Sequence, residues 1–425
     1  MDASAARSAL RAEQLPKVLH QMRGIAKSDG FYSNKYRAAG LDPRNIETFD
    51  DFEALPFTTK AEIAADQTDH PPYGTNFLQP RREYSRVHQT SGTTTGRPLR
   101  WLDTPASWNW ILDCWWVGFR DCIGLTRDDR VFFPFSFGPF LGFWAAFEAV
   151  ARDGHFAISG GGMPTTARLL SILEHRATVV CCTPTYALHL AEVAQSEKID
   201  LEQAGVRAVV VAGEPGGGIP ATRERIGGAW NARVYDHYGL TEVGPVAFET
   251  SDRPNEMRLL ESEFIVEVLD PITGRPGVSG ELVLTNLGRV GSPLIRYRTG
   301  DLVTLSPDSD VAGNRYLAGG ILSRADDMIH IRGNNLYPTA IEAVIRRFRE
   351  VVEFRIVVDR SEALSDLKIE IEPTTAEGGN RLVEAVGRAI RDELLFRADV
   401  VAVAPGTLPR FELKSQRVVR VTSGP

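Results

Sequence analysis

The sequence predicts an α/β protein with a large domain of mainly parallel sheets covered by helices, followed by a small α+β domain. With 425 residues, the chain is longer than one small hydrophobic core requires. Between residues 86 and 250, short β-branched and aromatic runs alternate with segments of helix length, which is typical of a parallel sheet buried on both faces. A new strand–helix pattern begins after Asp327, and we expect the domains to span residues 1–323 and 324–425.

The composition is that of an ordinary globular protein, with 43% hydrophobic and 24% charged residues. No run approaches the ~18 apolar residues of a membrane span, and the first twenty residues lack the apolar core of a signal peptide. We therefore expect a cytoplasmic protein. The net charge of −7 argues against a nucleic-acid partner, because no stretch is strongly basic.

The first 85 residues are polar and have helical character. The segment LPFTTK, residues 55–60, predicts an interruption of helical structure and then the start of a new helix, with Thr58 or Thr59 as the N-cap.

Five apolar runs predict the parallel sheet. They are RVFFPF (130–135), HFAIS (155–159), TVVCCTP (178–184), RAVVVAGEP (207–215) and ARVYDHYG (232–239). Several end at Gly or Pro, and loops at the carboxyl ends of parallel strands usually build the ligand site of such folds.

The pattern changes after residue 262. The runs EFIVEVLD (263–270) and GELVLTN (280–286) flank a turn-rich connection and predict antiparallel strands. In the second domain, Thr339 and Glu342 predict a capping box, ahead of an apolar helix stripe of Ile341, Val344, Ile345 and Phe348. Strands at 353–358 and 367–372, a helix at 380–396 and a strand at 400–405 complete the domain.

The four cysteines, Cys114, Cys122, Cys181 and Cys182, form no C-x-x-C pair. Adjacent cysteines rarely ligate one tetrahedral ion together, so we expect buried thiols and no structural zinc.

A loop of hydroxyl residues and glycines spans Thr90 to Pro98, TSGTTTGRP. Glycines let backbone N–H groups approach a polyanion, and hydroxyls add donors. A Walker A loop needs four residues between its glycines and then Lys. Here three residues separate Gly92 from Gly96, and Arg-Pro follows, so a P-loop nucleotidase is not expected.

Four further motifs follow in order. YDHYGLTE (235–242) brings an aromatic ring, a hydroxyl and a carboxylate together, and Glu242 is a candidate Mg²⁺ ligand. YRTGD (297–301) puts Asp301 after a tight turn, where it can accept hydrogen bonds from ribose. RADDMIHIRG (324–333) and LPRFELK (408–414) come last. Each motif alone has an ordinary structural explanation, such as a turn aspartate or a surface lysine.

Together, in this order, the five motifs resemble those of the adenylate-forming superfamily of acyl-CoA synthetases and adenylation domains. The branch most similar is that of phenylacetate–CoA ligases and related aryl-acid ligases, through LPFTTK, TPTYALHLAE (183–192), AGEP (212–215) and RADDMIHIRGNNLYPTAIE. The resemblance covers residues 50–420. It implies a distorted antiparallel β-barrel subdomain beside the parallel sheets and a mobile C-terminal lid.

The resemblance also implies roles for residues. Lys414 would bridge the acid and the α-phosphate of ATP, Thr241 would lie near that phosphate, and Glu242 would hold Mg²⁺. Asp301 and Arg324 would bind ribose, Asp326 would be the hinge of the lid, and Gly333 would line the thiol tunnel. Further nucleotide contacts are expected from Ser91, Gly92, Thr93, Thr94, Thr95, Gly96, Gly213, Glu214, Pro215, Asp236, Tyr238 and Gly239. The usual loop of this superfamily is S-G-T-T-G, and this chain has an extra Thr.

The acid pocket is expected at Phe135, Ser136, Phe137, Gly138, Ala212, His237 and Gly239. Aromatic rings beside a serine and a glycine suit a flat ring with one polar substituent. His237 either is a packed, hydrogen-bonded residue or faces the acid, at its carboxylate or at a ring amino or hydroxyl group.

The sequence thus predicts an enzyme that uses ATP and Mg²⁺ to convert an aromatic acid to an acyl-AMP, with release of pyrophosphate, and then to a CoA thioester. An aminobenzoate or hydroxybenzoate is favoured, with phenylacetate next. The alternative acceptor is the phosphopantetheine arm of a carrier protein. A homodimer is plausible by analogy with the branch.

Overall fold

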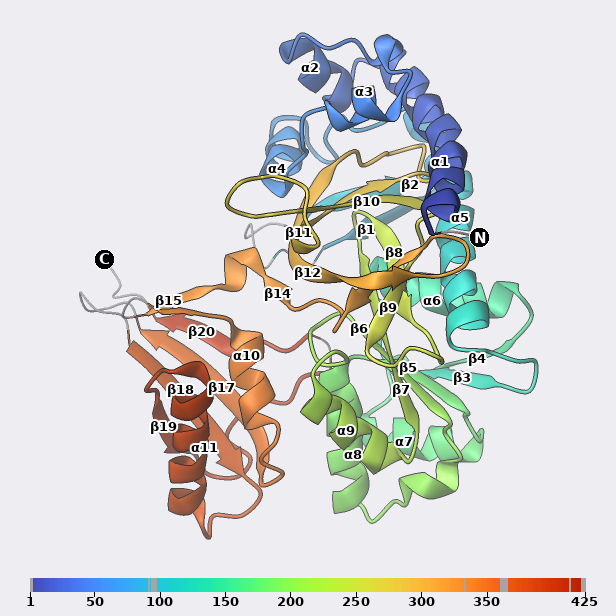
Figure 1. Cartoon of the computed structure of the whole chain (residues 1–425). Helices are drawn as coiled ribbons and strands as arrows, with labels where there is room; N and C mark the ends of the chain where they lie inside the picture. Colours follow the sequence, from blue (N-terminus) through green and yellow to red (C-terminus); the bar gives the residue numbers. More distant parts are fainter. Residues whose placement is uncertain are drawn as a thin grey trace.

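The computed structural model describes residues 3–90, 92, 98–331, 334–359, 366–412 and 414–421. At one end lie the N-terminal helices, blue in Figure 1. They are α1 (Ala3–Ala26), α2 (Phe31–Ala38), α3 (Phe49–Glu53) and α4 (Lys60–Asp69). Thr59 is the N-cap of α4 and forms a capping box with Glu62, whereas the Thr58 hydroxyl donates to the Ile295 carbonyl at 2.8 Å.

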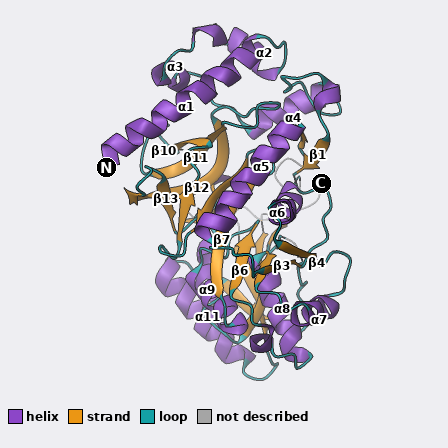
Figure 2. Cartoon of the chain, turned by 90° about the vertical axis from the view of Figure 1, so that its right-hand side faces the viewer, coloured by secondary structure: helices purple, strands orange, loops and turns teal. Residues whose placement is uncertain are grey.

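The five predicted parallel strands are confirmed, in the order β7-β6-β5-β3-β4. Their bounds are β3 (Arg130–Phe133), β4 (Phe156–Ser159), β5 (Val179–Cys182), β6 (Ala208–Ala212) and β7 (Arg233–Leu240). The helices between and around them are α5 (Pro105–Val117), α6 (Leu141–Arg152), α7 (Thr165–Glu174), α8 (Pro184–Ser196) and α9 (Pro220–Trp230). Figure 2 shows α5 and α6 in front of the sheet.

The two faces of this sheet belong to different cores, because successive strand side chains point to opposite faces. Cys181 and Val210 lie in the core with α5 and α6. Cys182 and Val211 lie in the core with α7, α8 and α9. All four cysteines are buried and free, which confirms the predicted burial.

The antiparallel strands continue the same sheet. They are β8 (Gly244–Glu249), β9 (Glu256–Leu259), β10 (Phe264–Leu269), β11 (Ser279–Asn286), β12 (Tyr297–Ser309), β13 (Arg315–Ala318) and β14 (Ser323–Arg324). β8 pairs antiparallel with β7 and so joins the two halves. The pairing of β10 with β11 is the one predicted from the sequence. A separate hairpin, β1 (Arg86–Gln89) with β2 (Arg100–Asp103), flanks the hydroxyl–glycine loop.

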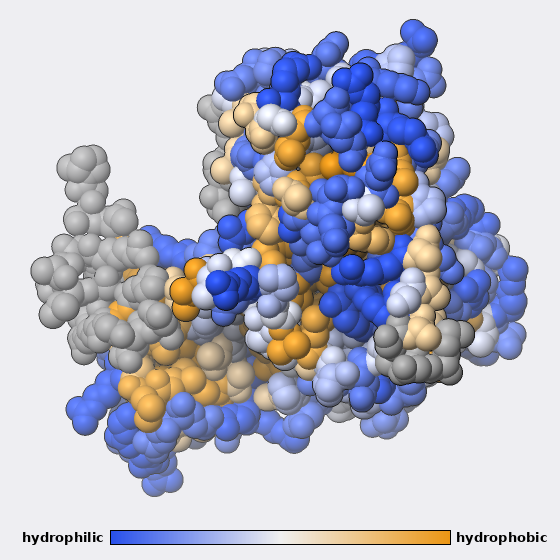
Figure 3. Space-filling model, turned by 45° about the horizontal axis from the view of Figure 1, so that its top comes forward, coloured by the Kyte–Doolittle hydropathy of each residue, from blue (hydrophilic) through white to orange (hydrophobic). Residues whose placement is uncertain are grey.

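The C-terminal lobe, residues 329–421, has its own core and is the smaller lobe at the lower left of Figure 3, where apolar residues gather. Its elements are β15 (Ile329–Ile331), β16 (Asn334–Leu336), α10 (Pro338–Ile345), β17 (Val351–Asp359), β18 (Asp366–Pro373), α11 (Gly379–Leu394), β19 (Asp399–Ala402) and β20 (Val418–Val421). The sheet order is β19-β18-β17-β20. A short helix, η5 (Ala325–Asp327), connects this lobe to β14. The domain boundary at 323/324 stays a prediction.

The predicted capping box at Thr339 and Glu342 is wrong. Pro338 is already the first residue of α10, so Tyr337 occupies the cap position and makes no side-chain cap bond. The Thr339 hydroxyl instead donates to the Leu322 carbonyl at 2.9 Å. Among the helices of the described residues, none combines the length and apolar content of a membrane span.

Candidate functional site

Three of the motifs meet where β7 ends beside β12. The Tyr238 hydroxyl donates to Oδ2 of Asp301 at 2.6 Å, and Arg324 donates to Oδ1 of the same carboxylate at 2.9 Å. Arg324 also donates to Asp326 at 2.9 Å. Burial raises the pKa of Asp301, and the neighbouring Arg324 opposes that rise. The expected adenine ring partner, ribose ligand and hinge residue are therefore linked by direct hydrogen bonds.

Glu242 is buried, and one of its two oxygens is already engaged. Oε1 accepts a 2.9 Å hydrogen bond from the Tyr297 hydroxyl. Oε2 has no protein partner among the described residues. No group of three or more His, Cys, Asp or Glu side chains in the described part of the chain can enclose a metal. One available carboxylate oxygen fits Mg²⁺, which is usually held by one or two carboxylates together with substrate phosphates and water.

The backbone of the same motif is held by a buried ion pair. Arg289 donates to the Thr241 carbonyl at 2.7 Å and pairs through two hydrogen bonds with Asp103, at 2.7 and 2.6 Å. Both side chains of the pair are fully buried. This pair connects the end of β2 to the turn that carries Thr241 and Glu242.

Asp236 lies on the opposite face of β7 from His237, in a cradle of glycines. A Cβ at Gly217 would lie 2.3 Å from the Asp236 carboxyl carbon, and one at Gly320 would lie 3.4 Å from Oδ2. Burial, with Glu249 nearby, raises the pKa of Asp236 to about 8. The carboxyl group is therefore protonated at neutral pH and has a proton to donate.

His237 is buried in an aromatic cluster. Its ring stacks on Phe248 at 4.1 Å between centroids and lies 4.2 Å from Trp115. Nδ1 is 2.9 Å from the Ala247 carbonyl oxygen. Burial lowers the pKa of His237 to about 3. The residue is thus packed and hydrogen-bonded through Nδ1, and this bond leaves Nε2 unengaged.

The phenylalanine-rich segment forms a cluster of rings at the end of β3. Phe135 stacks on Phe143 at 4.1 Å, and Phe137 contacts Trp144 at 4.8 Å. Ser136 and Gly138 are exposed beside them, and the Ser136 hydroxyl accepts a hydrogen bond from the Gly162 N–H at 3.4 Å. Phe135 shares a core with Trp115 and Tyr238, so the rings and the β7 motif border the same region.

Lys414 reaches this region from the C-terminal lobe. Its Cε lies 3.7 Å from the position of a Cβ on Gly213, which has φ +95°. The residue as a whole is exposed, although its side chain extends toward the main lobe at Gly213. Desolvation lowers the pKa of Lys414, and the nearby Glu242, Asp301 and Glu214 oppose that change.

Glu214 attaches the lysine loop to the main lobe. Its carboxylate accepts hydrogen bonds from the N–H groups of Ser415, at 2.6 Å, and Thr185, at 2.9 Å. Pro215 is exposed next to it. Both oxygens of Glu214 are therefore engaged by the protein, and its expected contact with the nucleotide stays a prediction.

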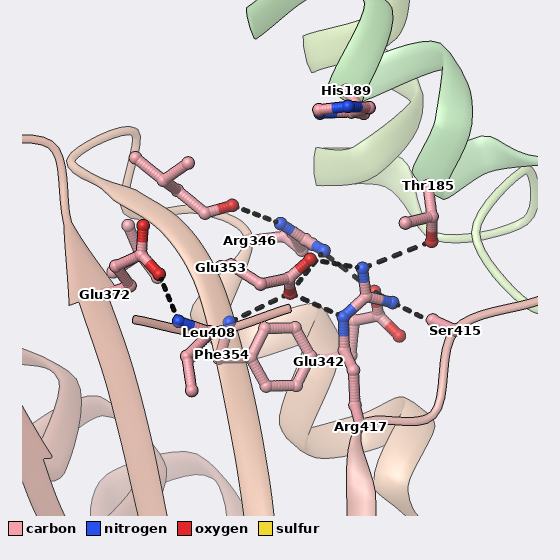
Figure 4. Close-up of polar contacts among 12 residues, drawn as sticks. Thr185, His189, Glu342, Arg346, Glu353, Phe354, Glu372, Leu408, Ser415 and Arg417 are labelled. Carbon is pink, nitrogen blue, oxygen red and sulfur yellow. Dashed lines mark hydrogen bonds and ion pairs between the residues drawn. The ribbon is translucent and has the colours of Figure 1, made fainter. Parts of the chain in front are cut away.

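A buried cluster around Arg417 continues this attachment, as Figure 4 shows. Arg417 pairs with Glu353 of β17 at 2.6 Å and donates across the lobes to the Thr185 hydroxyl at 3.1 Å. It also donates to the Ser415 hydroxyl at 2.8 Å. The residue that follows Lys414 is thus fixed by the C-terminal sheet and by the start of α8.

Two more ion pairs join the lobes. Arg410 pairs with Glu192 of α8 at 2.9 Å and with Glu372 of β18 at 2.6 Å. Arg168 of α7, almost fully buried, pairs with Glu412 at 3.0 Å. Lys414 therefore enters the site on a segment held on both sides.

The structure brings together most of the predicted residues that it describes: Glu242, Thr241, Asp301, Arg324, Tyr238, Gly239, Ala212, Gly213, His237, Asp236 and Lys414. Within residues 91–96 of the hydroxyl–glycine loop, the structure describes Gly92, which has φ +75°. Ser91, Thr93, Thr94, Thr95, Gly96 and Gly333 lie outside the described residues.

Sequence reasoning missed Tyr297, Arg289 and Arg417 as supporting residues. Tyr297 begins the YRTGD motif, so its place beside Asp301 was a usable signal. Arg289 and Arg417 carry no local pattern, because their partners Asp103 and Glu353 are 186 and 64 positions away.

Comparison with known proteins agrees with this geometry. Residues 55–288 match the family model "AMP-binding enzyme", and residues 333–420 match "AMP-binding enzyme C-terminal domain". Phenylacetate-coenzyme A ligase of Thermus thermophilus is 30% identical, over 96% of this chain and 95% of that protein.

Two solved states of 2-hydroxyisobutyryl-CoA ligase are also similar. The postadenylation state, with R3-HIB-AMP, has a TM-score of 0.90 at 28% identity and covers 99% of this chain and 90% of that one. The thioesterification state, with 2-HIB-AMP and CoA, has a TM-score of 0.71 at 30% identity and covers 100% and 91%. The lobes of this chain are therefore arranged as in the postadenylation state.

Proposed function

Because this chain belongs to the AMP-binding enzyme family and is an AMP-forming acid–CoA ligase, we propose that the acid it activates is aromatic. The observation that carries the proposal is the cluster of aromatic rings at the end of β3, in which Phe135 stacks on Phe143 and packs edge-on against Phe137. Phe135 belongs to the same hydrophobic core as Tyr238 of the β7 motif. Stacked and edge-on rings provide a flat apolar surface that suits an aryl group. The phenylacetate ligase named above, which aligns over nearly the whole chain, supports the same substrate class.

In the first half-reaction, a carboxylate oxygen of the acid attacks the α-phosphorus of ATP. A new P–O bond forms, the bond to the β-phosphate oxygen breaks, and pyrophosphate leaves. We propose that Lys414 stabilises the charge that develops on the carboxylate and α-phosphate oxygens, because a mobile ammonium group near Glu242 and Asp301 can follow both. Thr241 lies at the α-phosphate, and Glu242 holds Mg²⁺, which neutralises phosphate charge.

We propose that the nucleoside binds where β7 ends beside β12. Tyr238 lies against adenine, and the protonated Asp236 donates a hydrogen bond to the base. Asp301, with Arg324, binds the ribose hydroxyls; its oxygens already accept from Tyr238 and Arg324, and each retains a lone pair. Gly213 and Gly239 leave room for the nucleotide because they have no side chain.

In the second half-reaction, the thiol of CoA loses its proton and attacks the acyl carbon, and AMP leaves. The Lys414 segment must withdraw to admit the thiol. We propose that the lobe formed by residues 324–425 rotates about Asp326, which is bonded to Arg324, and that Gly333 then lines the entry. The relatives that align over nearly the whole chain are CoA ligases, and nothing favours a carrier protein as acceptor.

The proposal is tested by pyrophosphate release from purified protein with ATP and a panel of acids. We expect aryl acids such as aminobenzoates, hydroxybenzoates, benzoate and phenylacetate to be turned over. Acetate, palmitate and 2-hydroxyisobutyrate should be poor substrates. Release with these aliphatic acids alone would overturn the aromatic assignment.

The catalytic assignment is tested by Lys414→Ala, with Lys368→Ala as a matched control. Lys368 lies in the same lobe and pairs with Glu370 at 3.0 Å, away from the site. Lys414→Ala should lose ATP–pyrophosphate exchange by at least about 100-fold while still binding ATP, and Lys368→Ala should retain exchange. Unchanged exchange in Lys414→Ala would refute its role.

A further inference from the structure

The hydrogen bond at Nδ1 determines which nitrogen of His237 carries the ring proton. The Ala247 carbonyl oxygen, 2.9 Å from Nδ1, accepts hydrogen bonds and has none to donate, so Nδ1 carries the proton. Burial lowers the pKa of the ring to about 3, so the imidazole is neutral near pH 7. Nε2 is therefore an unprotonated acceptor.

Nε2 is not fully enclosed by the protein. It has no hydrogen-bond partner among the described residues, and it retains accessible surface. The indole Nε1 of the adjacent Trp115, by contrast, is sealed from solvent. The neighbouring Gly239 is exposed. A Cβ on that glycine would lie 3.3 Å from Nε2, 2.8 Å from the Gly244 carbonyl oxygen and 3.1 Å from Cα of Pro245. The side of Nε2 next to Gly239 is thus bordered by the backbone of Gly239 and of β8.

Two relationships connect His237 to the residues assigned to the reaction centre. His237 is the register partner of Ala212 across β7 and β6, and the next residue, Gly213, approaches Cε of Lys414. On its own strand, His237 lies four residues before Thr241. We therefore place the group that meets Nε2 on the acid, close to its carboxylate.

The ring of His237 is held in this orientation. Phe248 stacks on one face with an interplanar angle of 24°, and Trp115 packs at 4.2 Å. A carboxylate directed at Nε2 would place two lone pairs opposite each other, because neither group has a proton to share. An amino or hydroxyl group has the proton that Nε2 needs.

We propose that Nε2 of His237 accepts a hydrogen bond from an amino or hydroxyl group at position 2 of the aromatic acid. This inference rests on the proposed activation of an aryl acid and adds the substituent that the pocket selects. A buried acceptor discriminates strongly, because an analogue without the donor leaves it unpaired. His237 is thus a specificity residue, and the acids recognised are 2-amino- and 2-hydroxyaryl acids.

The test is a set of kcat/KM values from pyrophosphate release with closely related acids. The wild type is given benzoate, 2-aminobenzoate, 2-hydroxybenzoate and 2-methoxybenzoate, with the 3- and 4-isomers of the amino and hydroxy acids. We expect at least one 2-amino or 2-hydroxy acid to exceed benzoate, 2-methoxybenzoate and the other isomers by about tenfold or more. Equal use of benzoate, or preference for a 3- or 4-isomer, would overturn the proposal.

The same acids are then given to two variants. His237→Phe keeps an aromatic ring against Trp115 and Phe248 but removes the acceptor, so the preference for a donor should fall to within about threefold. His237→Gln restores an amide oxygen as acceptor and should recover part of the preference. A preference that persists in His237→Phe would refute the role of Nε2.

The measured quantity is a ratio of substrates within one preparation, so partial misfolding of a variant does not affect it. The same measurements distinguish an error in the aromatic assignment from an error in the assignment of His237. A wild type that activates aliphatic acids and no aryl acid refutes the aromatic assignment. A wild type that activates aryl acids without regard to the position-2 donor refutes only the assignment of His237.

Discussion

The Tyr297 hydroxyl donates a 2.9 Å hydrogen bond to Oε1 of Glu242, which links the first residue of β12 to the carboxylate assigned to Mg²⁺. The bond leaves Oε2 without a protein partner among the described residues and directs it away from the tyrosine. Partners of this kind orient a metal ligand and tune its affinity. We therefore expect Tyr297 to position Glu242 for the metal.

Tyr297→Phe should raise the Mg²⁺ concentration required for half-maximal ATP–pyrophosphate exchange by roughly tenfold. The ring is retained, so the core around it changes little. The measurement is a Mg²⁺ titration at constant ATP. Tyr316→Phe, in β13 and stacked under Arg253, is the control. An unchanged Mg²⁺ requirement in Tyr297→Phe would show that the bond does not position Glu242.

Arg289→Met should destabilise the protein strongly, because it leaves the buried Asp103 without its partner; breaking such a pair costs about 3–5 kcal/mol. The double variant Asp103→Leu/Arg289→Met should recover most of that stability, since no charge is left unpaired. Both should remain poor in pyrophosphate exchange, because the Thr241 carbonyl loses its donor. Urea unfolding and exchange assays separate the two effects, and an active double variant would contradict the positioning role.

The ion pairs between the lobes should favour the first half-reaction over the second. Glu192→Gln and Glu412→Gln together remove the contacts to Arg410 and Arg168. Partly exposed pairs contribute up to about 1 kcal/mol each, so adenylation should fall by roughly three- to tenfold. Thioester formation from supplied acyl-AMP should be unchanged or faster.

The matched control for this pair of variants is Glu197→Gln, an exposed residue just after α8. Salt gives a second measurement, because screening weakens exposed pairs. Adenylation by the wild type should decline with ionic strength more steeply than adenylation by the double variant. Equal loss of both half-reactions would mean that the pairs do not govern lobe position.

Asp236 should make the stability of the protein fall as pH rises. Its pKa in the folded state is about 8, above the ordinary aspartate value of 3.8. Between these values the unfolded chain releases the proton and the folded chain keeps it, so the free energy of unfolding decreases with pH. Asn resembles the protonated carboxyl group, so Asp236→Asn should flatten this dependence from about pH 4 to pH 8 and gain most over the wild type near pH 8.

The measurement is urea unfolding across that pH range, with Asp128→Asn, at an exposed aspartate, as the control. A parallel pH dependence in Asp236→Asn and wild type would contradict the raised pKa of Asp236. The comparison needs no activity, so it is independent of the role of Asp236 in nucleotide binding.

The order of the elements and most of the candidate site could be predicted from the sequence, because they depend on local patterns. Runs such as VVCC and AVVVA are apolar at every position, as strands buried on both faces must be. Motifs such as YGLTE and YRTGD keep their residues adjacent in the chain. The predicted capping box at Thr339 was wrong for a local reason too, because α10 begins at Pro338, two residues before the start that an N-cap at Thr339 predicted.

Other features depended on residues far apart in the sequence, and only the tertiary structure decided them. The meeting of Tyr238 with Asp301, the support of Thr241 by Arg289 and the attachment of Lys414 through Glu214 each join segments separated by dozens to hundreds of positions. The tertiary structure also decided which ring nitrogen of His237 carries the proton, since the Ala247 carbonyl comes from the neighbouring strand. The sequence by itself thus determined the chemistry that is present. The packing of β7 between its neighbours decided which atoms of that chemistry are engaged by the protein and which are left available, because hydrogen-bond partners and burial exist only once the strands are paired.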